Sequence, residues 1–171
     1  GLIPAAETGT ERGTDLKRVF PMGKELKAEV IEMNGDKVKL TITAATRTEK
    51  DTMGEMLVPA SALYGASTQR AVLNFPVSGR PVPAEAITAY ATLKAACAAV
   101  NHKLGRLDEK RTTSILEACR EIADGLPQFG GLAAHFPIDI YQTGSGTSTN
   151  MNANEVIANL VCLRNHKPIG S

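Results

Sequence analysis

The sequence contains no tryptophan, and aromatic residues make up only 4% of its 171 residues. A core without large aromatic side chains must be formed mainly by Leu, Ile, Val and Ala, and hydrophobic residues reach 43% of the chain. Leu and Ala are among the best helix formers. The composition therefore favours a largely helical core in one domain or a small pair of domains.

An excess of charge of either sign is also absent. The chain has 19 basic and 18 acidic residues, which gives a formal net charge of +1. Residues 1–46 are neutral as well, with seven basic and seven acidic side chains. Because nucleic-acid-binding domains usually carry a basic excess, this balance argues against a partner held mainly by charge.

Cysteine is scarce, and the three cysteines, Cys97, Cys119 and Cys162, lie far apart in the sequence. Their spacing indicates neither a metal site nor a disulfide framework. We expect them to be small buried side chains of a protein in the reducing cytoplasm. The sequence predicts no metal and no cofactor.

Long hydrophobic runs are missing too. No stretch approaches the ~18 apolar residues that would span a bilayer, and no signal-peptide pattern is present, so we expect no membrane partner. The chain begins with Gly1 and not with methionine, which indicates a cut N-terminus.

Residues 24–43 have the two-residue period of β-strands. Apolar residues alternate with charged ones over residues 24–30 and again over residues 37–43, which predicts one buried and one exposed face. Asn34-Gly35 between them is a strong signal for a hairpin turn. One or two short strands are also expected around residues 53–59.

From Pro83 onward the period changes to that of helices. A first helix is expected over residues 83–104, with one apolar stripe formed by Ile87, Tyr90, Leu93, Cys97, Val100 and Leu104. A second helix should begin after Asp108 as its N-cap and end at Gly125. A short strand over residues 138–141 and a third helix over residues 152–163 complete the prediction. The fold class is therefore α+β, with a small antiparallel β segment followed by a mainly helical domain.

The segment from Thr143 to Asn154 carries the clearest chemical signal. Gly144 and Gly146 permit close backbone approach to a ligand, and hydroxyl and amide side chains crowd around them. The following helix would point its positive N-terminus at this loop. These features make an anion site without a formal charge, for a carboxylate or a phosphate. The alternative is a connector whose hydroxyls only cap the helix.

Longer motifs decide between these interpretations. The string from Thr143 to Asn159, TGSGTSTNMNANEVIAN, resembles the first signature of class II fumarases in the aspartase/fumarase superfamily. An upstream match in the same order comprises Asp51–Glu55, Val58-Pro59, Tyr64–Ala71 and Asn74-Phe75. The resemblance covers about residues 47–171. Ser145 favours fumarase, since aspartases more often have alanine there.

The resemblance implies a largely helical subunit of a homo-oligomer that converts fumarate and water to malate in the tricarboxylic acid cycle. It places Ser145, Gly146 and Thr147 at the C4-dicarboxylate substrate, with Asn150 and Asn152 holding the loop. The family's later segments, which contain a His-Pro-Asn-Asp motif, a Thr-His pair and a mobile Gly-Ser-Ser loop, do not occur in this sequence. No catalytic residue is therefore assigned, and the chain alone is expected to be inactive.

Residues 1–46 resemble the C-terminal half of an S1 domain, a five-stranded OB barrel that binds RNA. The similar segments are Gly1–Glu7, Met22–Ile31 and Lys37–Ile42. Only Phe20 could stack on a base, whereas single-strand binding needs aromatic platforms and a basic groove. Two alternatives to the lyase segment stay open: an S1-type RNA-binding module, and a chimeric or truncated fusion without activity. Unpaired strand edges also predict self-association through this segment.

Other polar residues receive structural interpretations. His102, His135 and His166 are isolated, and each is expected to be exposed or satisfied within the core. Gln69 and Arg70 are expected to serve packing or subunit contacts before substrate binding.

Overall fold

The computed structural model describes residues 29–34, 37–41 and 46–170. The chain divides into two compact units, Gly1–Ala45 and Thr46–Ser171. A mixture of helices with small two-stranded antiparallel sheets confirms the coarse α+β prediction.

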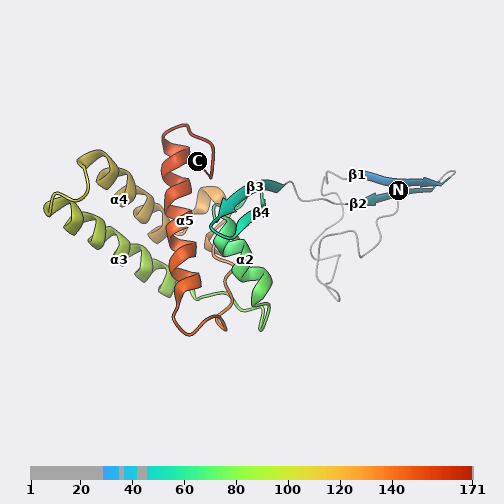
Figure 1. Cartoon of the computed structure of the whole chain (residues 1–171), viewed down its shortest axis with the longest axis horizontal. Helices are drawn as coiled ribbons and strands as arrows, with labels where there is room; N and C mark the ends of the chain where they lie inside the picture. Colours follow the sequence, from blue (N-terminus) through green and yellow to red (C-terminus); the bar gives the residue numbers. More distant parts are fainter. Residues whose placement is uncertain (1–28, 35–36, 42–45, 171) are drawn as a thin grey trace. The chain divides into compact units, whose positions relative to one another are not determined.

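The first unit contains one described antiparallel hairpin, β1 (Glu29–Asn34) and β2 (Lys37–Thr41) (Figure 1). Asn34 pairs with Lys37, and the predicted Asn34-Gly35 turn lies partly outside the described residues. The register shifts between Val30 and Glu32, which leaves Ile31 as a bulge residue. The predicted strand residues 24–28, and Pro4 and Phe20, lie outside the described residues.

The second unit begins with the hairpin of β3 (Thr46–Asp51) and β4 (Gly54–Pro59). The sequence predicted one or two short strands around residues 53–59 but no strand over residues 46–51, whose inward-facing side chains are charged. Arg47 resolves this, since its guanidinium donates to the carbonyls of Pro59 at 2.8 Å, Ala62 at 2.7 Å and Tyr64 at 2.7 Å. The charged side chain of Arg47 can therefore face inward, because its N–H groups donate to carbonyls of the loop that the strand covers.

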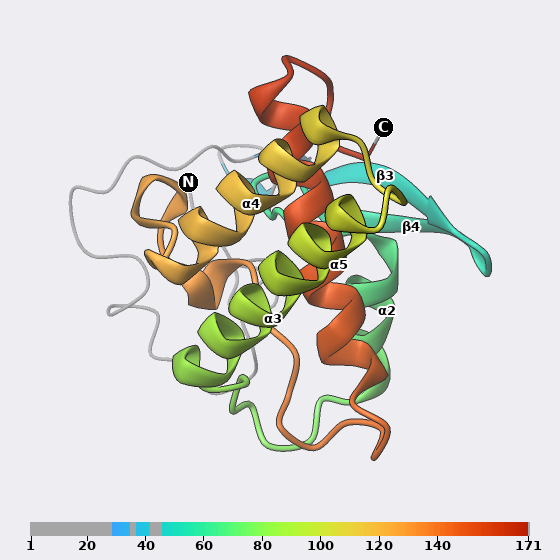
Figure 2. The same ribbon diagram turned by 90° about the vertical axis from the view of Figure 1, so that its left-hand side faces the viewer.

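Four α-helices and the β3–β4 hairpin build most of the second unit, together with two short 3-10 helices, η2 (Pro127–Phe129) and η3 (Leu132–Ala134). The helices are α2 (Ala66–Asn74), α3 (Ala84–Lys103), α4 (Glu109–Ala123) and α5 (Thr147–Arg164). Figure 1 shows α5 in the middle of this unit, with α3 and α4 on one side and α2 with the hairpin on the other. In Figure 2 α3 and α4 run side by side in front of α5.

The core is centred on α5, which buries Ala153, Val156, Ile157 and Leu160. Leu63, Cys119, Ile122, Leu126 and Phe136 pack into the same cluster from the other segments. Two predicted helix boundaries are confirmed here. Asp108 caps α4, where its carboxylate accepts from the Arg111 N–H at 2.9 Å, and α3 ends just before Gly105 at a φ of +68°.

Only the first part of the predicted stripe of α3 faces the core, where Tyr90 packs against the core beside Ile87. Ile87 is buried, but Leu93, Val100 and Leu104 are 57%, 54% and 61% exposed, and Cys97 is exposed as well. α3 buries Ala91 and Ala98 instead, because close packing against α4 and α5 accommodates small side chains. The prediction for Cys97 was wrong, whereas Cys119 is buried as expected.

Asp139 fixes the segment that leads toward the glycine-rich loop. Its carboxylate accepts from the Ser78 N–H at 2.7 Å, the Ser78 hydroxyl at 2.8 Å, and the Gly79 and Tyr141 N–H groups at 2.8 Å each. The predicted strand at residues 138–141 reduces to a single bridge between Asp139 and Pro81. Among the residues that the structure places, no helix is long and apolar enough to cross a membrane.

Candidate functional site

The glycine-rich loop runs directly into α5. Gly146 is the N-cap of that helix at a φ of +69°, a left-handed conformation that glycine adopts without strain. Its N–H donates to the Thr143 carbonyl at 3.0 Å, which closes a turn with Ser145 near its tip. Ser145 and Thr147 are exposed and Gly146 is half-buried, so the three predicted substrate-binding residues form one accessible surface.

The predicted third helix starts five residues earlier than expected, at Thr147 and not at residue 152. Thr147, Ser148, Thr149 and Asn150 have modest helix propensity, which pointed to a later start. The side chain of Gln142 supplies the missing stabilisation. Its Oε1 accepts from the Thr149 N–H at 3.0 Å, and its Nε2 donates to the Thr149 hydroxyl at 2.7 Å.

The capping by Gln142 leaves two backbone donors open. The first N–H groups of a helix have no intrahelical acceptor, and in α5 only the third is taken by Gln142. The N–H groups of Thr147 and Ser148 accordingly find no acceptor within the described part of the chain. They lie at the positive end of a helix whose first turn has no acidic side chain.

Hydroxyls surround these donors. The Ser145 Oγ lies 2.9 Å from the Thr147 Oγ1 and 3.2 Å from the Thr143 Oγ1, so the three hydroxyls form a hydrogen-bonded row. A hydroxyl can both donate and accept, so the row can turn its protons toward a bound anion. The geometry supports an anion site at this loop.

Two further residues approach the loop from α3, and the sequence interpretation missed both. The Lys94 Nζ donates to the Asn150 Oδ1 at 2.6 Å. The Tyr90 hydroxyl lies 3.7 Å from the position that a Cβ on Gly146 would occupy. Helical spacing assigned Tyr90 only to the apolar stripe. Nothing in the sequence around Lys94, four residues after Tyr90, indicates a contact with the loop.

Buried amides hold α5 behind the loop. The Asn152 Nδ2 donates to the His135 carbonyl at 2.9 Å, and the Asn159 Nδ2 donates to the Leu63 carbonyl at 2.9 Å. Asn150 and Asn152 thus make the holding contacts that the resemblance implied. Both buried amides anchor α5 to segments distant in sequence.

Glu155 joins α5 to α2. Its carboxylate accepts from the Gly65 N–H at 2.9 Å, the Ser67 N–H at 2.9 Å, and the Thr68 N–H at 3.1 Å. N–H groups at the start of a helix have no acceptor within that helix, so a side chain from another helix provides the cap of α2. Gly65 has no side chain, and a Cβ there would collide with Glu49.

The other predicted polar residues have structural roles. Arg70 forms a bidentate ion pair with Asp51, at 2.9 and 3.1 Å, and its hydrogen bond lowers the pKa of that carboxyl. The Gln69 Oε1 accepts from the Tyr64 hydroxyl at 3.2 Å.

The three histidines also behave as expected. His135 is 1% exposed, and burial lowers its pKa. Its Nδ1 accepts from the Leu63 N–H at 3.1 Å and its Nε2 lies 2.9 Å from the Phe129 carbonyl, so the proton resides on Nε2. His102 and His166 are exposed. Within the described ranges, no group of side chains has the composition of a metal site.

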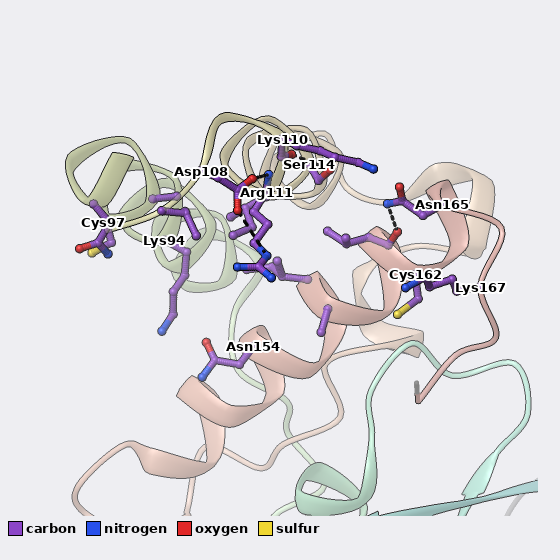
Figure 3. A pocket seen from close by; sticks show the side chains of 17 residues that line it. Lys94, Cys97, Asp108, Lys110, Arg111, Ser114, Asn154, Cys162, Asn165 and Lys167 are labelled. Carbon is purple, nitrogen blue, oxygen red and sulfur yellow. Dashed lines mark hydrogen bonds and ion pairs between the residues drawn. The ribbon is translucent and has the colours of Figure 1, made fainter. Parts of the chain in front are cut away.

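A groove of about 910 Å³ lies between α3, α4 and α5 (Figure 3). Ala98, Ile115, Ile157, Ala158 and Val161 contribute apolar lining. The basic side chains Lys94, Lys110, Arg111 and Lys167 also line it, and Asp108 is already engaged by Arg111 at 3.4 Å. Lys94 therefore belongs both to this groove and to the contact with Asn150.

Comparison with known proteins defines the class. The family model described as "Lyase" matches residues 54–169, and the chain belongs to this lyase family. Among its relatives is the class II fumarate hydratase of Corynebacterium glutamicum, 55% identical over 114 residues, which are 67% of this chain and 23% of that enzyme. The class II fumarate hydratase of Mycobacterium tuberculosis is 53% identical over 118 residues, 69% of this chain and 24% of the enzyme.

Solved structures agree with this assignment. The fumarate lyase:delta crystallin of Brucella melitensis superposes with a TM-score of 0.67 at 43% identity, over 74% of this chain and 29% of that one. Recombinant class II fumarase from Schistosoma mansoni gives a TM-score of 0.67 at 36% identity, over 74% of this chain and 26% of that one. The chain thus spans about a quarter of the length of the curated relatives it matches.

Proposed function

We propose that this chain supplies the substrate-carboxylate loop of a fumarate hydratase-type lyase. Ser145, Gly146 and Thr147 contact one carboxylate of a C4 dicarboxylate in this proposal. The observation that carries it is the pair of open N–H groups on Thr147 and Ser148, set beside the exposed hydroxyls of Ser145 and Thr147. A carboxylate can accept from all of these donors: the two N–H groups are fixed by the helix, and the hydroxyls need only turn their protons.

The proposed reaction gives these donors a catalytic use. Removal of the proton next to a carboxylate pushes charge onto its oxygens, and the resulting aci-carboxylate is stabilised by donors that already point at it. Fixed N–H groups at a helix terminus suit this task because they are held by the helix itself. The base that removes the proton is not assigned to any of these 171 residues, so the isolated chain is expected to give no turnover.

The wider assembly is part of the same proposal. The active form is a homo-oligomer, as the family resemblance implies, and residues 47–171 are its N-terminal lyase domain, within the compact unit Thr46–Ser171. The proposal that residues 1–46 are the C-terminal half of an S1-like unit rests on the sequence resemblance of Gly1–Glu7, Met22–Ile31 and Lys37–Ile42. RNA binding by that segment stays a prediction from its sequence.

A graft tests the proposed loop. Residues 54–169 would replace the matching segment of the Corynebacterium glutamicum enzyme, and fumarate hydration would be followed by the loss of ultraviolet absorbance. We expect an active graft, and we expect Ser145→Ala or Thr147→Ala to lower kcat/KM by about 10²-fold, the typical effect of losing one preorganised donor.

The matched control is Ser114→Ala, which removes a hydroxyl that donates only to the Lys110 carbonyl on α4. That variant should keep full activity. An active graft that tolerates both loop substitutions would contradict the assignment of Ser145 and Thr147.

A further inference from the structure

Lys94 brings a formal positive charge to the N-terminal turn of α5. We infer that Lys94 is a positioning residue that gives the proposed carboxylate loop its selectivity for charged over neutral ligands. This inference rests on the proposed function, since it concerns the same loop. The proposed site then contains one cation in addition to its neutral N–H and O–H donors.

The contact with Asn150 links Lys94 to the loop. The Nζ donates to the Asn150 Oδ1 at 2.6 Å, and the Asn150 N–H donates to the Gly146 carbonyl at 3.1 Å. Lys94 on α3 therefore holds the residue that closes the first turn of α5 behind Gly146. In Figure 3 the Lys94 side chain leaves α3 toward the part of α5 that carries Asn154.

The placement of this charge is electrostatically unfavourable in the absence of an anion. Cations are normally stabilising near the C-terminus of a helix and destabilising near its N-terminus. The first turn of α5 contains no acidic residue that would compensate. The ion pairs among the described residues involve Arg47, Arg70, Arg111 and Arg164, and none includes Lys94.

An anion at the loop would relieve this repulsion. The Lys94 ammonium and the two open N–H groups then act on the same negative charge from different sides of the first helical turn. The Asn150 contact keeps the long lysine side chain in one place, so little rotamer entropy is lost when the anion arrives. A neutral ligand would gain the hydrogen bonds of the loop but nothing from Lys94.

The test compares two ligands of similar shape, succinate and the uncharged succinamide. Amide chemical shifts of Thr147 and Ser148 would report binding to the full chain in ¹⁵N spectra. We expect Lys94→Gln to weaken succinate binding about fivefold, the order of size of a charge–charge interaction near a protein surface, and to leave succinamide binding unchanged. Lys94→Arg should restore most of the succinate affinity.

Lys103→Gln is the charge-matched control, because Lys103 is exposed and is the last residue of α3, whereas Lys94 lies near the middle of the helix. It should leave both affinities unchanged. If wild-type chain binds succinate and Lys94→Gln binds it equally well, the inference about Lys94 is overturned while the proposed loop stands. If the wild-type chain binds neither ligand, the inference about Lys94 is overturned, and the graft decides separately on the proposed loop.

Salt dependence provides a measurement that needs no variant. Raising the sodium chloride concentration screens a charge–charge interaction, so succinate affinity of the wild-type chain should fall while succinamide affinity stays constant. Equal salt responses of the two ligands would overturn the role of Lys94 even if Lys94→Gln failed to fold.

Discussion

Glu155 binds Thr68 twice, because its Oε2 accepts from the Thr68 N–H at 3.1 Å and from the Thr68 hydroxyl at 2.5 Å. These two bonds, with those from Gly65 and Ser67, make one carboxylate the cap of a helix on the other side of the core. The segment containing Thr68 and the loop helix α5 therefore share one anchoring point.

The first prediction concerns this carboxylate. Glu155→Ala should lower the free energy of unfolding by about 2–3 kcal/mol, since it removes a helix cap and charge-assisted hydrogen bonds. Glu85→Ala is the control, because Glu85 is exposed in the first turn of α3, and it should change stability by less than about 0.5 kcal/mol. Urea unfolding followed by circular dichroism measures both, and equal effects would contradict the capping role.

The second prediction concerns the left-handed N-cap. Gly146→Ala should destabilise the chain by about 1 kcal/mol, because alanine at a φ of +69° is strained. Steric conflict is not the cause, since the new Cβ would meet only the Tyr90 hydroxyl, at 3.7 Å.

Gly144→Ala is the matched control for Gly146, because a Cβ on Gly144 meets nothing within 4 Å and its φ is not positive. Gly146→Asn should recover part of the loss, as asparagine tolerates the left-handed region. Thermal unfolding measures the Tm of the three variants, and we expect Gly144→Ala to have the highest Tm and Gly146→Ala the lowest. A Gly144→Ala variant as unstable as Gly146→Ala would refute the conformational explanation.

The third prediction is a pH dependence of stability that arises from Asp139. Burial raises the pKa of this carboxyl, but its hydrogen bonds from Tyr141, Ser78 and Gly79 outweigh burial and lower the pKa from 3.8 to about 2. A depressed carboxyl pKa means that the unfolded chain binds more protons. The stabilisation is therefore fully present above pH 3.8 and is lost as the pH falls through about 2.

Asp139→Asn should flatten that acid limb of the stability curve and should lower stability at neutral pH. Urea midpoints measured between pH 6 and pH 2 test both effects. Asp124→Asn is the control, because Asp124 is exposed at the end of α4, and its curve should follow that of the unmodified chain. Parallel curves for Asp139→Asn and the unmodified chain would exclude Asp139 as the source.

The fourth prediction separates core from surface among leucines. Leu160 is 1% exposed, so Leu160→Ala should cost about 2–5 kcal/mol through the cavity that it leaves. Leu93 belongs to the stripe that the sequence placed in the core but is 57% exposed, so Leu93→Ala should cost less than about 0.5 kcal/mol. A large loss at Leu93 would show that the stripe of α3 is covered in solution.

The sequence predicted the helix pair α3–α4 well, because the residues that end one helix and begin the next are next to these helices in the sequence. Gly105 ends one helix, and Asp108 begins the next with its own side chain. It missed α2, whose start is stabilised by Glu155 from another helix. It also placed the start of α5 too late, since the Gln142 cap lies outside the helix.

The loop residues themselves were predictable because glycine and hydroxyl side chains gather there in one short segment. Lys94 was not, since its relation to Asn150 exists only after α3 packs beside α5, 56 positions later in the chain. The orientation of the α3 stripe failed for the same kind of reason. Periodicity identifies an apolar face, but the neighbours decide whether that face is covered.

The position of α5 also constrains the order in which the molecule can form. Its buried contacts join partners far apart in the chain, such as the hydrogen bond from the Gly65 N–H to Glu155 across 90 positions. Closing such long loops is slow, because the chain entropy is lost before the contacts repay it. During synthesis the hairpin of β3 and β4, α2 and the α3–α4 pair emerge first, and they gain a common core only when α5 leaves the ribosome. A ribosome stalled before the end of α5 would therefore carry a collapsed, protease-sensitive chain.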